Sequence, residues 1–230
     1  MKTLGMLGGM SWESTAEYYK LINEAVGRRL GNLHSGKIIL NSVDFGEIEH
    51  LQHNGEWQRL GIILSDAAYA LQKAGAEGMI LCTNTMHKLT PHIKENIDIP
   101  FIHIADETAK KLIKDNIQKV GLLGTAFTME QEFYKSRLIE KYSLEVLIPP
   151  KQQIDEIHRV IYDELCVGIT KEESRAYYAK AIEGLQKQGA QAVILGCTEI
   201  GLLISQEDSV LPIYDTTKIH AEAAVEWMLQ

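Results

Sequence analysis

The feature that most constrains this fold is an internal repeat, in which three segments of the first half of the chain return in the second half. The matched segments are KTLGMLG (2–8) and KVGLLG (119–124), AGAEGMILCTNT (74–85) and QGAQAVILGCTE (188–199), and IPFIHIADETA (99–109) and LPIYDTTKIHA (211–221). The three pairs are offset by 116, 114 and 112 residues. Because three separate matches agree on one spacing, they indicate two copies of one folding unit.

Within each copy, short apolar runs alternate with amphipathic stretches such as 56–74 and 171–188. The apolar runs lie at 2–8, 37–43, 78–82, 101–104, 119–123, 144–148, 192–195 and 211–214. Strands that alternate with helices form a parallel sheet covered on both faces. We therefore expect an α/β fold of two pseudo-symmetric lobes, each a four-stranded parallel sheet with helices on both faces. Residues 1–104 with 215–230 would form the first lobe, and residues 105–214 the second.

Charge and cysteine content exclude several classes of protein. The chain has 31 acidic and 23 basic side chains, a formal charge of -8, and no stripe of Lys and Arg, so we expect no nucleic acid partner. No apolar run reaches the roughly 18 residues of a membrane span. The three cysteines form no CxxC pair, and His103 and His220 lack an acidic partner at ligand spacing, so we expect neither disulfides nor a metal. A cytoplasmic protein with reduced thiols fits best.

Two polar turns carry the candidate chemistry: LCTNTMHKLT (81–90) and LGCTEIGLLI (195–204). Pseudo-symmetry would bring Thr83 and Cys197 to opposite walls of a cleft at the carboxyl ends of the strands, where open parallel sheets bind ligands. Inverting a tetrahedral carbon by moving one proton needs an acid and a base on opposite faces. A thiol of pKa about 8.5 suits this role. A helix N-terminus after Cys197 would lower the thiol pKa and burial would raise it, so the sequence leaves that pKa open.

Other residues near these turns have structural interpretations. Cys166 lies in a helical run and is expected in the core. Cys82 is less clear, because strand alternation points it away from the side chain of Thr83, so that one of the two faces the cleft and the other the core. His87 is expected as a structural partner and Ser11 as a helix cap, while Gly8 and Gly9 would let backbone N–H groups approach a small anion.

The strings LGGMSWEST, YYKLIN, TNTMH and GCTE together resemble the cofactor-independent aspartate/glutamate racemases over the whole chain. The resemblance implies a homodimer, an amino acid substrate, no metal and no pyridoxal phosphate, with the proton removed and returned by the two motif positions. Those positions are Cys197 and Thr83. The resemblance also implies substrate-binding roles, which fall on Met10, Gln52, Asn84, Thr85 and Thr198.

This sequence departs from the family pattern in two ways. Thr83 stands where the family has a cysteine, and a hydroxyl is far too weakly acidic to replace a thiol. Thr83 could pass the proton through water, Cys82 could act instead, or Cys197 could work alone, as in the related arylmalonate decarboxylases. The second departure concerns the residues that would bind a side-chain carboxylate. Near Gln52 only His53 could do so, and no Lys precedes Lys171 in the matching stretch of the second half. Neutral amino acids therefore also remain possible substrates.

The predicted function is therefore a cofactor-independent racemase of aspartate, glutamate or a related amino acid. Two alternatives remain. One is a one-thiol decarboxylase or isomerase of a dicarboxylate, and the other is a non-catalytic amino acid binding protein.

Overall fold

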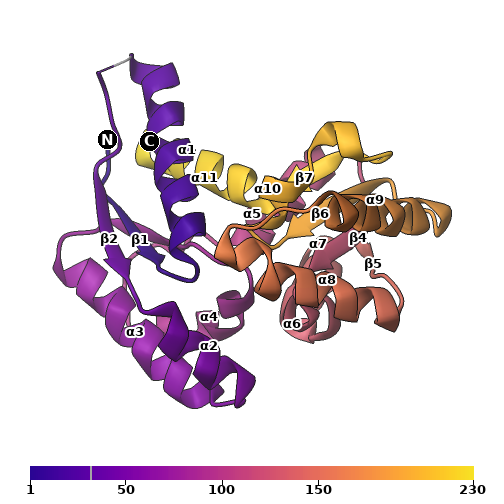
Figure 1. Cartoon of the computed structure of the whole chain (residues 1–230). Coiled ribbons are helices and arrows are strands. Elements are labelled where there is room, and N and C mark those ends of the chain that lie inside the picture. The colour runs from indigo at the N-terminus through magenta and orange to yellow at the C-terminus, as the bar shows by residue number, and fades with distance from the viewer. Residues whose placement is uncertain (32) are drawn as a thin grey trace. The chain divides into compact units, whose positions relative to one another are not determined.

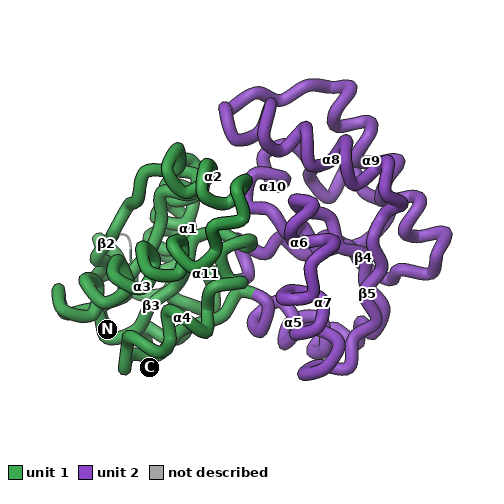
Figure 2. The backbone as a smooth tube through the Cα atoms, turned by 90° about the horizontal axis from the view of Figure 1, so that it is seen from below, with its two compact units in different colours: residues 1–104, 220–230 green, residues 105–219 purple. Residues whose placement is uncertain are grey.

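The computed structural model describes residues 1–31 and 33–230, whose contacts divide the chain into two units (Figure 2). The first unit comprises Met1–Ile104 with His220–Gln230, and the second Ala105–Ile219. The return to the first unit thus falls at His220, whereas the sequence placed it at Asp215. Among the described residues, no helix combines the length and the apolar character that a membrane span requires.

The first unit is a parallel sheet of three strands in the order β2-β1-β3. Its strands are β1 (Leu4–Gly8), β2 (Ile38–Ser42) and β3 (Gly78–Leu81). Its helices are α1 (Trp12–Leu30), α2 (Phe45–His53), α3 (Trp57–Lys73), the 3-10 helix η1 (Thr85–Leu89), α4 (Thr90–Glu95) and most of α11 (Thr216–Met228).

The fourth strand expected in the first lobe is reduced to a single bridge between Met79 and Phe101. The Met79 N–H donates to the Pro100 carbonyl at 2.8 Å, and the Ile102 N–H donates to the Met79 carbonyl at 3.0 Å. The chain then enters α5 (Ile104–Lys114), whose first turn carries Asp106 and Glu107. Acidic side chains stabilise a helix N-terminus, so α5 begins at Ile104, the last residue of the predicted strand.

Alternation along β1 gives the first unit an apolar core on each face of its sheet. Leu7 faces α2 and α3, where it packs with Ile48 and Leu64. Leu4 and Met6 face α1 and α11 and pack with residues of those helices, including Tyr18 and Val225. Figure 1 shows these two helix pairs on opposite sides of the sheet. Full burial of one such aliphatic side chain stabilises the fold by about 1.5–3 kcal/mol.

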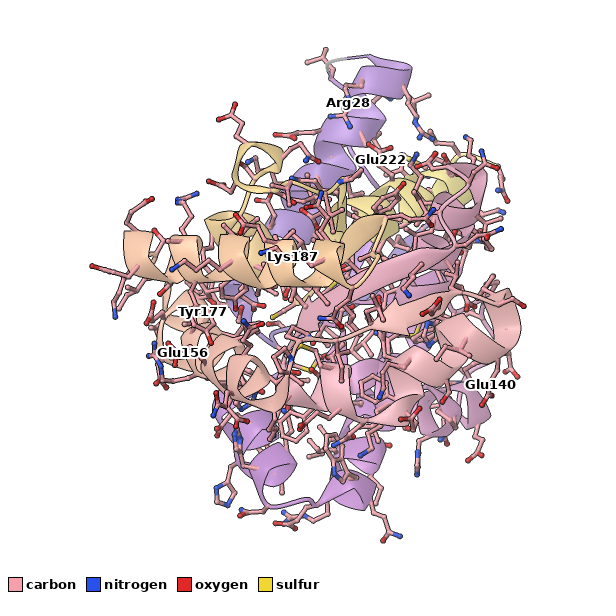
Figure 3. All side chains as sticks on the ribbon, turned by 90° about the vertical axis from the view of Figure 1, so that its right-hand side faces the viewer. Arg28, Glu140, Glu156, Tyr177, Lys187 and Glu222 are labelled. Carbon is pink, nitrogen blue, oxygen red and sulfur yellow. The ribbon has the colours of Figure 1, made fainter. Side chains whose placement is uncertain are left out.

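An ion pair joins the exposed edges of α1 and α11. Nη2 of Arg28 lies 2.7 Å from Oε1 of Glu222, and both side chains are labelled in Figure 3. Because both are exposed to solvent, the pair contributes less than about 1 kcal/mol. The buried apolar contacts, rather than this pair, hold the two helices together.

The second unit has the predicted four-stranded parallel sheet, in the order β5-β4-β6-β7. Its strands are β4 (Lys119–Gly124), β5 (Glu145–Leu147), β6 (Ala192–Gly196) and β7 (Ile213–Asp215). After α5, its helices are α6 (Ala126–Glu130), α7 (Glu132–Tyr142), α8 (Lys151–Asp163), α9 (Glu172–Lys187) and α10 (Ile200–Leu203), with 3-10 helices η2 (Leu165–Val167) and η3 (Gln206–Asp208).

Candidate active site

Strand register gives Thr83 and Cys197 equivalent positions in the two units. In the first unit Leu7 of β1 pairs with Leu81 of β3, and in the second Leu123 of β4 pairs with Leu195 of β6. Thr83 and Cys197 each lie two residues after the second member of these pairs. The sequence repeat is therefore also a repeat of strand register, and Thr83 and Cys197 occupy equivalent positions in the two copies.

Hydrogen bonds to the imidazole of His87 fix the backbone at Thr83. His87 Nδ1 donates to the Thr83 carbonyl at 2.7 Å, and the Ile104 N–H donates to His87 Nε2 at 3.3 Å. A carbonyl can only accept and an amide N–H can only donate, so these bonds select the neutral ring with its proton on Nδ1. These contacts match the structural role expected for His87. Thr83 itself is 8% exposed.

Cys82 faces away from the site, into the core formed with α1 and α11. Its side chain is fully buried beside Tyr18 and Ile22, and burial raises the pKa of its thiol far above the usual value. A thiol in these surroundings remains protonated and apolar in character. This packing favours the interpretations in which Cys82 takes no part in chemistry.

Cys197 follows β6 and is hydrogen-bonded to a buried carboxylate. Its Sγ donates to Oε2 of Glu199 at 2.9 Å, and Oγ1 of Thr198 donates to the same oxygen at 2.7 Å. Burial is the main cause that raises the pKa of the Cys197 thiol well above its usual value, and the negative charge of Glu199 raises it further. The helix that could have lowered this pKa, α10, is only four residues long and begins three residues later. Burial, and not a helix N-terminus, therefore sets the direction of the Cys197 pKa shift, which the sequence left open.

Glu199 is the residue of this site that sequence reasoning missed. Its side chain is 3% exposed. The signal was present in the GCTE string, where the acid stands two residues after the cysteine. Residues two apart lie on different sides of a helix, and in a strand they share a face but are about 7 Å apart along it. A hydrogen bond of 2.9 Å between Cys197 and Glu199 therefore depends on the turn at 197–199.

The remaining candidate residues are divided between the two units. Met10, Gln52, Asn84 and Thr85 belong to the first unit and are buried, Gln52 on the inner side of α2. Thr198 belongs to the second unit and is partly exposed. The Thr198 hydroxyl donates its proton to Glu199. This hydroxyl would have to rotate before it could donate to a substrate carboxylate.

The glycine turn after β1 is a folded turn and does not present Gly9 to an anion. The Gly9 N–H donates to Thr15 Oγ1 at 2.8 Å, which corrects the expectation of an anion-binding N–H there. Ser11 caps α1 as expected, because its Oγ accepts from the Ser14 N–H at 3.3 Å. The turn therefore serves to start α1.

The basic side chains that could bind a substrate carboxylate, His53 and Lys171, have acidic neighbours. His53 Nδ1 lies 2.8 Å from Glu49 Oε1, and Lys171 Nζ lies 3.2 Å from Glu164 Oε1. Within residues 1–31 and 33–230, no group of three or more His, Cys, Asp or Glu side chains is arranged to hold a metal ion.

A profile of the Asp/Glu/Hydantoin racemase family matches residues 7–224. The chain belongs to this family. It is 25% identical to the broad specificity amino-acid racemase RacX of Bacillus subtilis, over 71% of this chain and 70% of the relative. A crystal structure of a Yersinia pestis protein assigned as an Asp/Glu racemase superposes with a TM-score of 0.93 at 52% identity, covering all of both chains.

An aspartate racemase homologue from Pyrococcus horikoshii superposes with a TM-score of 0.87 at 32% identity, again over all of both chains. These matches confirm the two-lobed α/β fold and, at the level of the family, the expectation of an amino acid racemase that works without pyridoxal phosphate.

Proposed function

We propose that this chain racemises the α-carbon of aspartate, glutamate or a related amino acid, with Cys197 and Thr83 serving opposite faces of that carbon. The observation that supports the proposal is the shared register of β1 with β3 and of β4 with β6, which gives the two residues equivalent positions in the two copies of the repeated unit. Met10, Gln52, Asn84, Thr85 and Thr198 would bind the substrate. We also propose a cytoplasmic homodimer, on the family resemblance.

The chemistry proposed for the two faces is unequal. Cys197 exchanges a proton with the α-carbon directly, because a thiol is far more acidic than the hydroxyl of Thr83 in the same surroundings. On the other face the hydroxyl of Thr83 cannot ionise, so a water held by Thr83 delivers or removes the proton. The enantiomer that presents its α-proton to Cys197 should therefore exchange faster than its mirror image.

The substrate range of this site should include neutral amino acids. A side-chain carboxylate is best held by a bidentate Arg, and the basic side chains considered for this role, His53 and Lys171, already have carboxylate neighbours. Recognition through the α-ammonium and α-carboxylate alone would admit several side chains. Aspartate and glutamate remain candidates through family membership.

Deuterium wash-in tests the proposal. The protein is incubated in heavy water, without added cofactor, with the L and D forms of Asp, Glu and several neutral amino acids. Loss of the α-proton is followed by NMR, and inversion by chiral chromatography. Exchange should occur, should be faster for one enantiomer, and should fall at least about 100-fold in Cys197→Ser, since general acid–base groups contribute about 10² to 10⁴.

The control for that variant is Glu183→Gln, which changes an exposed side chain of α9 in the second unit and should keep the wild-type rate. No exchange with any amino acid would refute racemisation of this set. A change of substrate mass with release of carbon dioxide would instead support the one-thiol decarboxylase, and binding without reaction would support a binding protein.

A further inference from the structure

The side of α1 that faces away from its sheet carries a stripe of exposed and partly exposed residues. They recur every three or four positions and are Ala16, Tyr19, Asn23, Gly27 and Leu30. Tyr19 is 53% exposed and Leu30 is 43% exposed. Figure 1 shows α1 beside α11 on one side of the sheet of the first unit. Residues at this spacing share one face of a helix, so the stripe is a continuous surface along α1.

Leu33 extends this surface beyond the end of α1. Its side chain is fully exposed. The chain that follows it is tied back to α1, because the Gly36 N–H donates to Oδ1 of Asn23 at 2.9 Å. A hollow of about 680 Å³ lies beside α1, and Tyr19, Gly27 and Leu33 are among the residues that line it. Apolar side chains that gather around a hollow on the surface mark a place where another molecule binds.

The stripe is complementary to itself in size. When two α1 helices lie antiparallel about a two-fold axis at Asn23, Tyr19 of each copy faces Gly27 of the other, and Leu30 of each copy faces Ala16 of the other. Each large side chain thus meets a small one. At the axis, the amide of Asn23 already donates to the Tyr19 carbonyl at 2.7 Å, so close contact there leaves its polar groups satisfied.

Charges along one edge of the stripe are complementary in the same arrangement. Lys20 and Glu24 are exposed and lie one turn apart on α1. In an antiparallel pair the same edges of both helices meet, so Lys20 of each copy reaches Glu24 of the other. Within one chain, Nζ of Lys20 lies 3.8 Å from Oε2 of Glu17, a weak contact in solvent. A parallel pair would place like charges side by side, so charge selects the antiparallel orientation.

We propose that the stripe and Leu33 form the surface through which two copies of this chain associate, with their α1 helices antiparallel about a two-fold axis at Asn23. The inference rests on the homodimer proposed above and gives that homodimer its surface. A second copy is the occupant, because both the size and the charge of the side chains match when this surface meets itself. Apolar anchors inside a charged rim are typical of specific protein interfaces.

Sedimentation velocity of the full chain over a dilution series tests this surface. The wild type should be a dimer. Tyr19→Glu and Leu33→Glu should each raise the dissociation constant at least about 100-fold, because a few apolar anchors carry most of the binding energy of an interface. Tyr69→Glu on α3 is the matched control, since Tyr69 is 45% exposed, and it should leave the dissociation constant unchanged.

Gly27→Leu separates association from folding. A Cβ at Gly27 would lie 3.8 Å from the His34 carbonyl oxygen, an ordinary contact, and leucine favours a helix more than glycine does. The variant should therefore keep the helix content of the wild type, measured by circular dichroism. It should dimerise at least about 100-fold more weakly, because the new side chain occupies the place of Tyr19 of the second copy.

Exchanging the charges tests the orientation of the two helices. Lys20→Glu and Glu24→Lys should each dimerise about tenfold more weakly than the wild type at low ionic strength, because each variant places like charges opposite each other. An equimolar mixture of the two variants should recover the wild-type dissociation constant, since every acidic position then faces a basic one. A change confined to one helix cannot produce this recovery.

A dimer that persists unchanged in Tyr19→Glu, Leu33→Glu and Gly27→Leu would overturn the inference and leave the homodimer in place. Failure of the mixed charge variants to recover would overturn the antiparallel arrangement. A monomeric wild type would remove the proposed homodimer and this inference together. The proposed racemase activity is judged separately by deuterium wash-in, and none of these results changes that outcome.

Discussion

The position of Thr83 is fixed by hydrogen bonds of its backbone and not by its side chain. Its carbonyl accepts from His87, whose other ring nitrogen accepts from Ile104. This network depends on main-chain atoms and on the imidazole, and none of it uses the Thr83 hydroxyl. The position is therefore built to place a side chain, and the identity of that side chain can be changed without disturbing the turn.

Replacing Thr83 with cysteine should convert the unequal pair into two thiols. The two side chains are similar in volume, and a thiol has a pKa close enough to neutrality to exchange protons with the α-carbon. Racemisation measured by chiral chromatography should increase by about 10- to 100-fold, and the two enantiomers should exchange at more similar rates. Thr83→Ser, which keeps a hydroxyl, is the control. Equal rates in the cysteine variant and the wild type would argue against a direct role for this position.

At the scale of elements, the sequence repeat correctly predicted most of the strands and the alternation of strands with helices, and it failed where the conformation of a local turn determines the structure. Residues 101–104 were expected as a strand because they are apolar, yet the acidic first turn of α5 starts a helix at Ile104. The contact of Cys197 with Glu199 could not be predicted, because it arises from a turn and not from a regular period. Periodicity reports which residues are buried, and it does not report the dihedral angles of a turn.

The turn between β1 and α1 should be intolerant of any side chain at Gly9. Gly9 has φ +91, and a Cβ there would overlap the Val43 backbone. Gly9→Ala should lower the free energy of unfolding by more than about 2 kcal/mol, because strain and overlap add. Gly55→Ala is the matched control, since Gly55 has φ +70 with no atom near the added methyl group, and should cost about 1 kcal/mol. Urea denaturation measures both, and equal losses would contradict the argument.

At the scale of the whole chain, the first unit is completed by the C-terminal segment His220–Gln230. His220 is the first residue of that segment, and it is fully buried. Its Nε2 donates to the Ile102 carbonyl at 2.9 Å, and the Tyr18 hydroxyl donates to its Nδ1 at 2.9 Å. One neutral imidazole thus ties α11 to α1 and to the segment after β3. The sequence could not identify this role, because the three segments are far apart in the chain.

Acid should therefore weaken the fold through His220. Burial lowers the pKa of this imidazole from its ordinary value of 6.5 to about 4, so the folded state binds the proton less well than the unfolded state does. The stabilisation from neutral His220 is present above the unfolded pKa and is lost as pH falls toward 4. A loss on the order of 3 kcal/mol follows from about 1.4 kcal/mol per pKa unit.

His220→Gln tests this linkage, because glutamine can still donate to the Ile102 carbonyl but does not titrate. The variant should be less stable than the wild type at neutral pH, yet its unfolding free energy, measured by urea denaturation from about pH 7 to 4.5, should fall less steeply. His34→Gln is the control, since His34 is exposed. Parallel pH profiles for the wild type and His220→Gln would show that acid acts on other groups, and that the closing segment is held mainly by the apolar contacts of α11.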